Sequence, residues 1–79
     1  MRLEIISDEK TISLDQVWSV LLTSYLGVAE ILPSHADSVF LIKRGDIVYN
    51  GSERIYTNGG VAWVRDDTVT IFERLGYHA

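Results

Sequence analysis

At 79 residues the chain has the length of one small domain, and with no cysteine it excludes disulfides, thiolate zinc sites and thiol nucleophiles. A formal net charge of −4 argues against a nucleic-acid-binding protein, which would carry a basic patch. No apolar run approaches the roughly 20 residues of a membrane span, and Met1–Glu4 lacks a signal peptide's apolar core, so we expect a cytosolic chain without direct membrane insertion.

The N-terminal third contains one clear strand and one ambiguous segment. Residues 3–6 are short and mostly apolar, and a turn signal at 7–10 follows them. Residues 13–22 carry apolar side chains at helical spacing and a capping-box pair at Ser13 and Gln16, which favours an amphipathic helix. Residues 17–23, with one Trp and two Val, read equally well as a strand. Periodicity does not decide between these two interpretations.

Residues 23–38 form the least regular stretch of the sequence. We interpret them as a long connection, and long connections in small domains are often functional. Within it, residues 25–32 contain a single acid, Glu30, among apolar side chains. These are Tyr25, Leu26, Val28, Ile31 and Leu32. Such a loop either packs on the rest of the domain or faces a partner.

The remainder of the chain predicts strands and hairpins. Residues 39–42 are apolar on both faces, which predicts a buried strand. Asn50-Gly51 between 47–49 and 54–57 predicts a hairpin, and Asp66-Asp67 between 61–65 and 68–72 predicts a second one. Trp18 and Trp63 are expected in the core. This pattern is typical of an all-β sandwich or barrel.

Four short segments occur in a characteristic order along the chain. Residues 3–7 and 9–11 come first, then Ile31-Leu32-Pro33-Ser34-His35-Ala36, then Lys43-Arg44-Gly45, and finally residues 58–71. They resemble the opening strand, the Pro-Gly-His-Ala signature, the Lys-Pro-Gly turn and the Ser-Gly-Gly turn with closing strands of the epsilon subunit of rotary (F-type) ATP synthases. The resemblance covers residues 1–73.

The sequence departs from this family at several positions. Ser34 stands where the signature has glycine, and Asp37 stands where the family has proline after His-Ala. Trp63 stands where the family often has an acidic residue, which would place Trp63 at an interface. The spacing Pro33-x-His35-x-Asp37 is similar to the sodium-type branch of the family.

The resemblance implies a small antiparallel β-sandwich, or flattened barrel, of about ten short strands over residues 1–73, with a short tail at 74–79. It implies two strands with a bend near Asp15 in place of a helix at 13–22. The C-terminal helical hairpin of the family is expected to be absent.

The resemblance also implies a function. It is that of a non-catalytic central-stalk subunit on the cytoplasmic face of the inner (plasma) membrane, which couples the gamma shaft to the membrane c-ring during proton- or sodium-driven ATP synthesis. By position, Ser7, His35 and Phe40 match residues that face gamma. Val28 matches the ring-facing loop position, and Tyr25, Leu26 and Glu30 are expected to share that contact. No cofactor, metal or nucleic acid is expected.

The residues themselves allow two other functions. A free-standing β-barrel interaction module would use its sheet edges and aromatic side chains. A small hydrolase is disfavoured, because no serine has a recognisable His and Asp set and Asp66-Asp67 reads as a turn. His35 remains either a shaft contact or a loop histidine bonded to the backbone.

Overall fold

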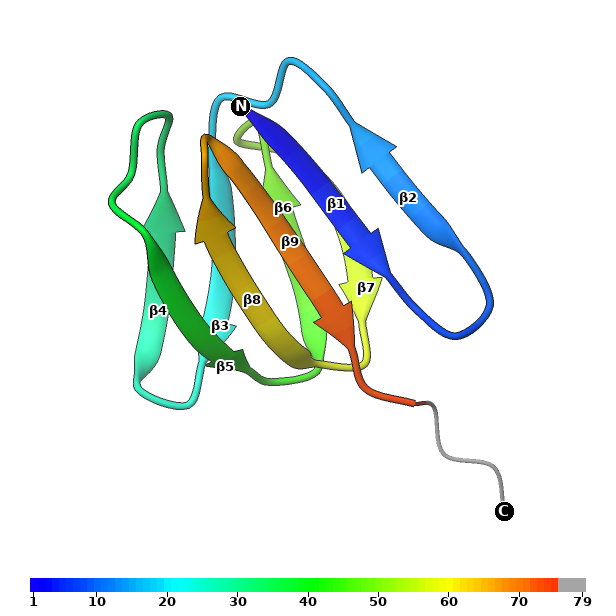
Figure 1. The fold of residues 1–79 in the computed structure, drawn as a ribbon. Coiled ribbons are helices and arrows are strands. Elements are labelled where there is room, and N and C mark those ends of the chain that lie inside the picture. Colours follow the sequence, from blue (N-terminus) through cyan, green and yellow to red (C-terminus); the bar gives the residue numbers. More distant parts are fainter. Residues whose placement is uncertain (76–79) are drawn as a thin grey trace.

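The computed structural model describes residues 1–75 and is built from β-strands (Figure 1). The nine strands of this part of the chain are β1 (Arg2–Ile6), β2 (Thr11–Leu14), β3 (Val20–Ser24), β4 (Gly27–Ile31), β5 (Ser38–Ile42), β6 (Gly45–Tyr49), β7 (Glu53–Thr57), β8 (Gly60–Arg65) and β9 (Thr68–Glu73). The all-β prediction is confirmed, with nine described strands against about ten expected. Residues 76–79, which include most of the expected tail and His78, lie outside the described residues.

The strands form one sheet that curls over itself into two layers. The order is β2-β1-β9-β8-β5-β3-β6-β7, and β4 pairs with the other side of β3. In Figure 1, β5, β8, β9, β1 and β2 make one layer, and β4, β3, β6 and β7 make the other. The layers are joined where β3 and β5 share one residue pair, Ser24 with Ile42. The strands pair antiparallel throughout residues 1–75 except for β1 and β9, which run parallel.

The core lies between the two layers and follows the period-two pattern of the strands. Leu3 and Ile5 of β1 face inward beside Val69 and Ile71 of β9, and all four are nearly inaccessible. The other buried apolar residues are Val17, Val20, Leu22, Ile31, Ile42, Ile47, Ala62 and Val64. Alternation therefore places one face of each strand in the core and leaves the other outside.

Both predicted hairpins are confirmed. Asn50, Gly51 and Ser52 connect β6 to β7, and the first two have φ angles of 51° and 80°. Asp66 and Asp67 connect β8 to β9 with φ angles of 52° and 56°, so both central residues of this two-residue turn are left-handed. Asn, Asp and Gly are the residues that accept this conformation at least cost, which is why the sequence signals were reliable.

Residues 13–22 form no helix; as the resemblance implied, two strands flank a bend. Gln16 has a φ of 58°, and the backbone groups of the two residues after it make hydrogen bonds to distant parts of the chain. The Met1 and Val17 backbones exchange two hydrogen bonds of 2.9 Å, and the Trp18 N–H donates to Asn50 Oδ1 at 2.7 Å. Long-range partners thus replace the bonds that a helix would have made. The described residues contain no helix suited to crossing a membrane.

The structure corrects three further predictions. The expected loop after Ser24 is a two-residue turn, Tyr25-Leu26, followed by strand β4, whose five residues all pair with β3. Strand β5 is buried on one face only, because Val39 and Leu41 are 64% and 61% exposed. Trp18 and Trp63 are also exposed instead of entering the core, and Trp18 covers Gly51.

Candidate functional site

The connection from β4 to β5 carries His35 and holds it close to Phe40. The His35 N–H donates to the Leu32 carbonyl at 3.1 Å, and its Nδ1 lies 2.7 Å from the Ala36 carbonyl oxygen. Because a carbonyl only accepts, this contact is a hydrogen bond in the tautomer that carries the hydrogen on Nδ1. The His35 and Phe40 ring centroids are 6.4 Å apart. The backbone bond expected of a loop histidine is therefore present, and contact with a shaft remains a prediction.

Asp67 fixes this connection from the opposite hairpin. Its Oδ1 accepts the Ser34 N–H at 3.1 Å, and its Oδ2 lies 3.7 Å from the Met1 ammonium group. Ser34 itself has a φ of 66°, which explains why glycine suits this position of the signature. The local pattern at Asp66-Asp67 predicts only a turn. It does not reveal this contact, because the two residues that meet are 33 positions apart.

Ser7 lies at the other end of the same layer from His35. Strands β1 and β9 run parallel, with Arg2 beside Thr68 and Ile6 beside Phe72. Asp67, which holds the His35 connection, precedes Thr68, whereas Ser7 follows Ile6 at the far end. Ser7 Oγ donates to the carbonyl of Lys10 at 3.0 Å within its own turn. The three predicted gamma-facing residues thus divide into a pair, His35 and Phe40, and a distant single residue.

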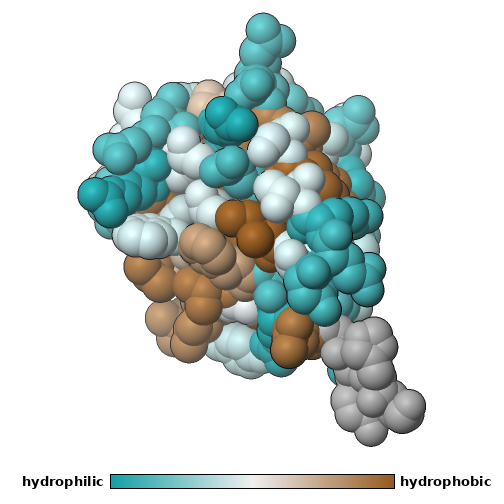
Figure 2. All heavy atoms as spheres, turned by 45° about the vertical axis from the view of Figure 1, so that its right-hand side comes forward, coloured by the Kyte–Doolittle hydropathy of each residue, from teal (hydrophilic) through white to brown (hydrophobic). Residues whose placement is uncertain are grey.

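The outward face between these two ends carries exposed apolar side chains. We call Val39, Leu41, Val61, Trp63 and Phe72 the outer-face patch. Cross-strand pairing places them together, because Trp63 stands opposite Val39, and Val61 stands opposite both Leu41 and Phe72. Except for the half-buried Val61, their exposure runs from 41% for Trp63 to 64% for Val39. Figure 2 shows apolar side chains gathered on the visible surface, bordered by hydrophilic ones.

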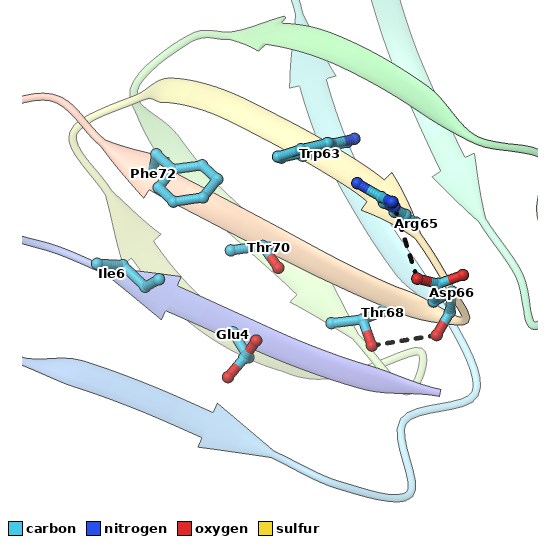
Figure 3. Close-up of a pocket in the computed structure, with 8 residues that line it drawn as sticks. All are labelled: Glu4, Ile6, Trp63, Arg65, Asp66, Thr68, Thr70 and Phe72. Atoms are coloured by element: carbon cyan, nitrogen blue, oxygen red, sulfur yellow. Dashed lines mark hydrogen bonds and ion pairs between the residues drawn. The ribbon is translucent and has the colours of Figure 1, made fainter.

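A shallow hollow of about 450 Å³ continues this face across β8, β9 and β1 (Figure 3). Trp63 and Phe72 stand at its apolar side, and Glu4 of β1 lies at its polar side. The Arg65 guanidinium lies 5.5 Å from the Trp63 ring centre and pairs with Asp66 at 3.6 Å. The hollow is therefore a mixed surface, suited to contact with a large partner.

The residues predicted to face the ring lie on the hairpin of β3 and β4. Its tip consists of Tyr25 and Leu26, which are 57% and 101% exposed. Buried Ser24 holds the tip by donating to the Gly27 carbonyl at 2.7 Å and accepting the Leu26 N–H at 3.1 Å. Val28 is exposed on β4, and Glu30 is exposed two positions further on. The structure thus gathers these four residues on one protruding element, while the ring contact itself stays a prediction.

Three cations surround Tyr25. Arg74 Nη2 donates to the Tyr25 hydroxyl at 3.3 Å, and Lys43 Nζ lies 5.5 Å from the centre of its ring. The hydrogen bond and charge of Arg74, aided by the charges of Lys43 and Arg44, lower the pKa of Tyr25 below its ordinary value. The sequence pattern predicts only a turn at Lys43-Arg44 and indicates no role for Arg74. The only signal for this cluster in the sequence is that basic residues directly follow two strands, Lys43-Arg44 after β5 and Arg74 after β9.

Comparisons with known proteins agree with this architecture. Residues 1–74 match the family model described as "ATP synthase, Delta/Epsilon chain, beta-sandwich domain". A chain in the cryo-EM structure of the central stalk/c-ring of the Tetrahymena thermophila mitochondrial ATP synthase has the same fold, with a TM-score of 0.78 and 17% identity. The match covers 92% of this chain and 62% of that chain. The comparison with curated proteins found no match.

Proposed function

Because the chain belongs to the ATP synthase delta/epsilon family, as its β-sandwich domain, we propose that it is a non-catalytic subunit of the central stalk of a rotary ATP synthase. In this role the domain joins the gamma shaft to the membrane c-ring, so that rotation passes between them during ion-driven ATP synthesis. It sits as a peripheral subunit on the cytoplasmic face of the membrane.

The outer-face patch is the observation that carries this proposal beyond family membership. A 79-residue domain has few apolar residues to spare, yet this chain leaves Val39, Leu41, Trp63 and Phe72 exposed on neighbouring strands. Adjoining apolar side chains rimmed by polar ones are characteristic of a protein contact. A packed partner would remove them from water.

The geometry supports a division of this domain into two contact regions. His35 at one end, Ser7 at the other and the outer-face patch between them form the side assigned to gamma. Phe40 lies beside His35 but is half-buried against the core, on the opposite face of β5 from Val39 and Leu41. The hairpin with Tyr25, Leu26, Val28 and Glu30 forms the part assigned to the ring. A long shaft lying along the layer would contact both ends, which explains how Ser7 and His35 share a partner.

A matched pair of variants tests the shaft contact. Leu41→Ser removes an apolar side chain from the outer-face patch, where Leu41 is 61% exposed. Leu21→Ser makes the same change on the other layer as a control, where Leu21 of β3 is 37% exposed. With the gamma subunit of the same source, we expect Leu41→Ser to weaken binding roughly 5- to 150-fold, as truncation of central interface residues does. Equal affinities for the two variants would reject this assignment of the face.

A further inference from the structure

The hollow beside the outer-face patch has a small side chain in its floor and larger ones around it. Strand pairing places Glu4, Thr70 and Trp63 in one row across β1, β9 and β8. In the next row, Ile6 stands beside Phe72. Thr70 is the smallest of these five side chains and lies in the middle of its row, so the surface dips over β9 (Figure 3). With a volume of about 450 Å³, the hollow can admit one long side chain of a partner.

The two sides of the hollow differ in chemistry. Trp63 and Phe72 form an exposed apolar side on β8 and β9. On the other side, Glu4 Oε2 accepts the Ser13 hydroxyl at 3.3 Å and lies 3.7 Å from Arg2 Nε. Glu4 Oε1 accepts no hydrogen bond from another residue in the range 1–75. One carboxylate oxygen is therefore available to a donor from a partner.

The chain's own cations satisfy this carboxylate only weakly. Arg2 Nε lies at nearly equal distances from Glu4 and Asp15, 3.7 and 3.8 Å, and the Arg2 side chain is 49% exposed. An exposed pair at such a distance contributes little. The other nearby cation is Arg65, whose guanidinium lies 5.5 Å from the Trp63 ring centre. This contact shows that the exposed indole accepts a guanidinium against its face.

We propose that the hollow receives a Lys or Arg side chain of the gamma subunit. The stem of that side chain packs against Trp63 and Phe72, and its charged end donates to Glu4 Oε1. A purely apolar side chain fits less well, because it would remove the carboxylate from water without supplying a donor. A long basic side chain has an apolar stem and a cationic end, which match the two sides of the hollow. This contact rests on the proposed stalk function and adds the chemistry of the partner at one position.

Binding of the gamma subunit of the same source to the 79-residue chain tests this contact. Glu4→Gln keeps the length of the side chain and an acceptor for Ser13 but removes the charge. We expect gamma affinity to fall roughly 10- to 150-fold, the range for hydrogen bonds to charged groups. The control Glu53→Gln removes the same charge from an exposed position on β7, in the other layer, and should leave the affinity nearly unchanged.

Salt dependence separates an ion pair from a change in shape. Raising the salt concentration should weaken gamma binding to the parent more steeply than to Glu4→Gln, because only the parent keeps the charge.

A second pair of variants tests the space itself. Thr70→Phe fills the floor of the hollow and should weaken gamma binding as strongly as Glu4→Gln does. Thr23→Phe makes the same change at an exposed position on β3, in the other layer, and should not weaken it. Circular dichroism should show the β-sheet spectrum of the parent in all four variants. Because Glu4→Gln and Thr70→Phe perturb different residues, either one tests the contact if the other fails to fold.

A double-mutant cycle identifies the partner side chain. Each Lys and Arg of gamma is replaced by Gln in turn, and each gamma variant is measured against the parent and against Glu4→Gln. One replacement should weaken binding to the parent but add little to the loss in Glu4→Gln. Three results would overturn the proposed contact. They are an additive loss for every gamma variant, equal affinities of Glu4→Gln and Glu53→Gln, and full affinity of Thr70→Phe.

The Leu41→Ser variant distinguishes failure of this contact from failure of the stalk proposal. If Leu41→Ser weakens gamma binding and Glu4→Gln does not, the hollow receives no cation and the stalk proposal stands. If the parent does not bind gamma, both proposals fail. If the isolated parent sediments as a dimer and Glu4→Gln as a monomer, a second copy of the chain occupies the hollow and the gamma contact is rejected.

Discussion

Replacing Asp67 should loosen the connection that carries His35, whereas replacing its neighbour Asp66 should not. Both residues have left-handed φ angles, 56° and 52°, so Asp67→Gly and Asp66→Gly relieve the same backbone strain. Only Asp67 also accepts the Ser34 N–H, at 3.1 Å, and approaches the Met1 ammonium, at 3.7 Å. The Asp66 side chain makes only an ion pair with Arg65, at 3.6 Å, which is weak because both side chains are exposed. The difference between the two variants therefore reports chiefly the contacts of the Asp67 side chain.

The magnitude follows from the exposure of these contacts. A hydrogen bond of this kind contributes about 1 kcal/mol to stability. Since the Asp67 side chain is 53% exposed, its ion pair adds about 0 to 1 kcal/mol after screening by solvent. We expect Asp67→Gly to be less stable than Asp66→Gly by about 1 to 2 kcal/mol. In a domain of this size each kcal/mol lowers Tm by roughly 4–8 °C.

Thermal unfolding and amide hydrogen exchange together provide the assay. Asp67→Gly should lower Tm relative to Asp66→Gly and speed exchange of the Ser34 amide. Asp67→Asn keeps an acceptor at the same place and should preserve most of that protection. The reasoning is refuted if the two glycine variants have the same Tm and the same protection at Ser34.

Two further predictions concern Gly59 and Tyr25. Gly59→Ala should destabilise the domain by roughly 2 kcal/mol more than Gly51→Ala. The two glycines have similar φ angles, +83° and +80°, so the backbone strain of the two variants is similar. However, the new Cβ of Gly59→Ala would meet a backbone atom at 2.7 Å, whereas that of Gly51→Ala would meet the Trp18 side chain at 3.3 Å. Denaturant unfolding measures this, and equal losses would contradict it. The Tyr25 phenol should ionise at a lower pH than an ordinary tyrosine, and Arg74→Gln should raise its pKa. Because the folded-state pKa is the lower one, any added stability appears only in alkaline solution and is lost as pH falls through that pKa. Tyrosinate absorbance, with Tyr25→Phe subtracted, tests the shift, and an unchanged titration in Arg74→Gln would refute the cause.

The sequence predicted best where local chemistry sets the backbone. Asn50-Gly51 and Asp66-Asp67 marked their hairpins because these residue types accept positive φ angles. Val69 and Ile71 marked the buried face of β9 because alternation is a local property. Residues 13–22 remained ambiguous because their hydrogen bonds go to Met1 and Asn50, which no local pattern reveals.

Other features depend on contacts between distant parts of the chain. Strand β4 was missed because Gly27, Ala29 and Glu30 have low strand propensity. The segment is held as a strand by its pairing with β3, which no local pattern reveals. The apolar residues of β5 suggested burial on both faces, but Val39 and Leu41 lie on a face that no other layer covers. The family resemblance proposed His35 and Phe40 for one surface, and the structure shows that their rings are neighbours.

Purification of the ATP synthase from membranes of the organism that encodes this chain tests the central claim most directly. With an affinity tag at the C-terminus of this chain, the account predicts recovery of the gamma subunit and the c-ring in the same particle. Cross-linking through a photoreactive residue in place of Trp63 should reach gamma in that particle. Recovery of the chain without gamma and the ring, in membranes where the synthase is intact, would contradict the account.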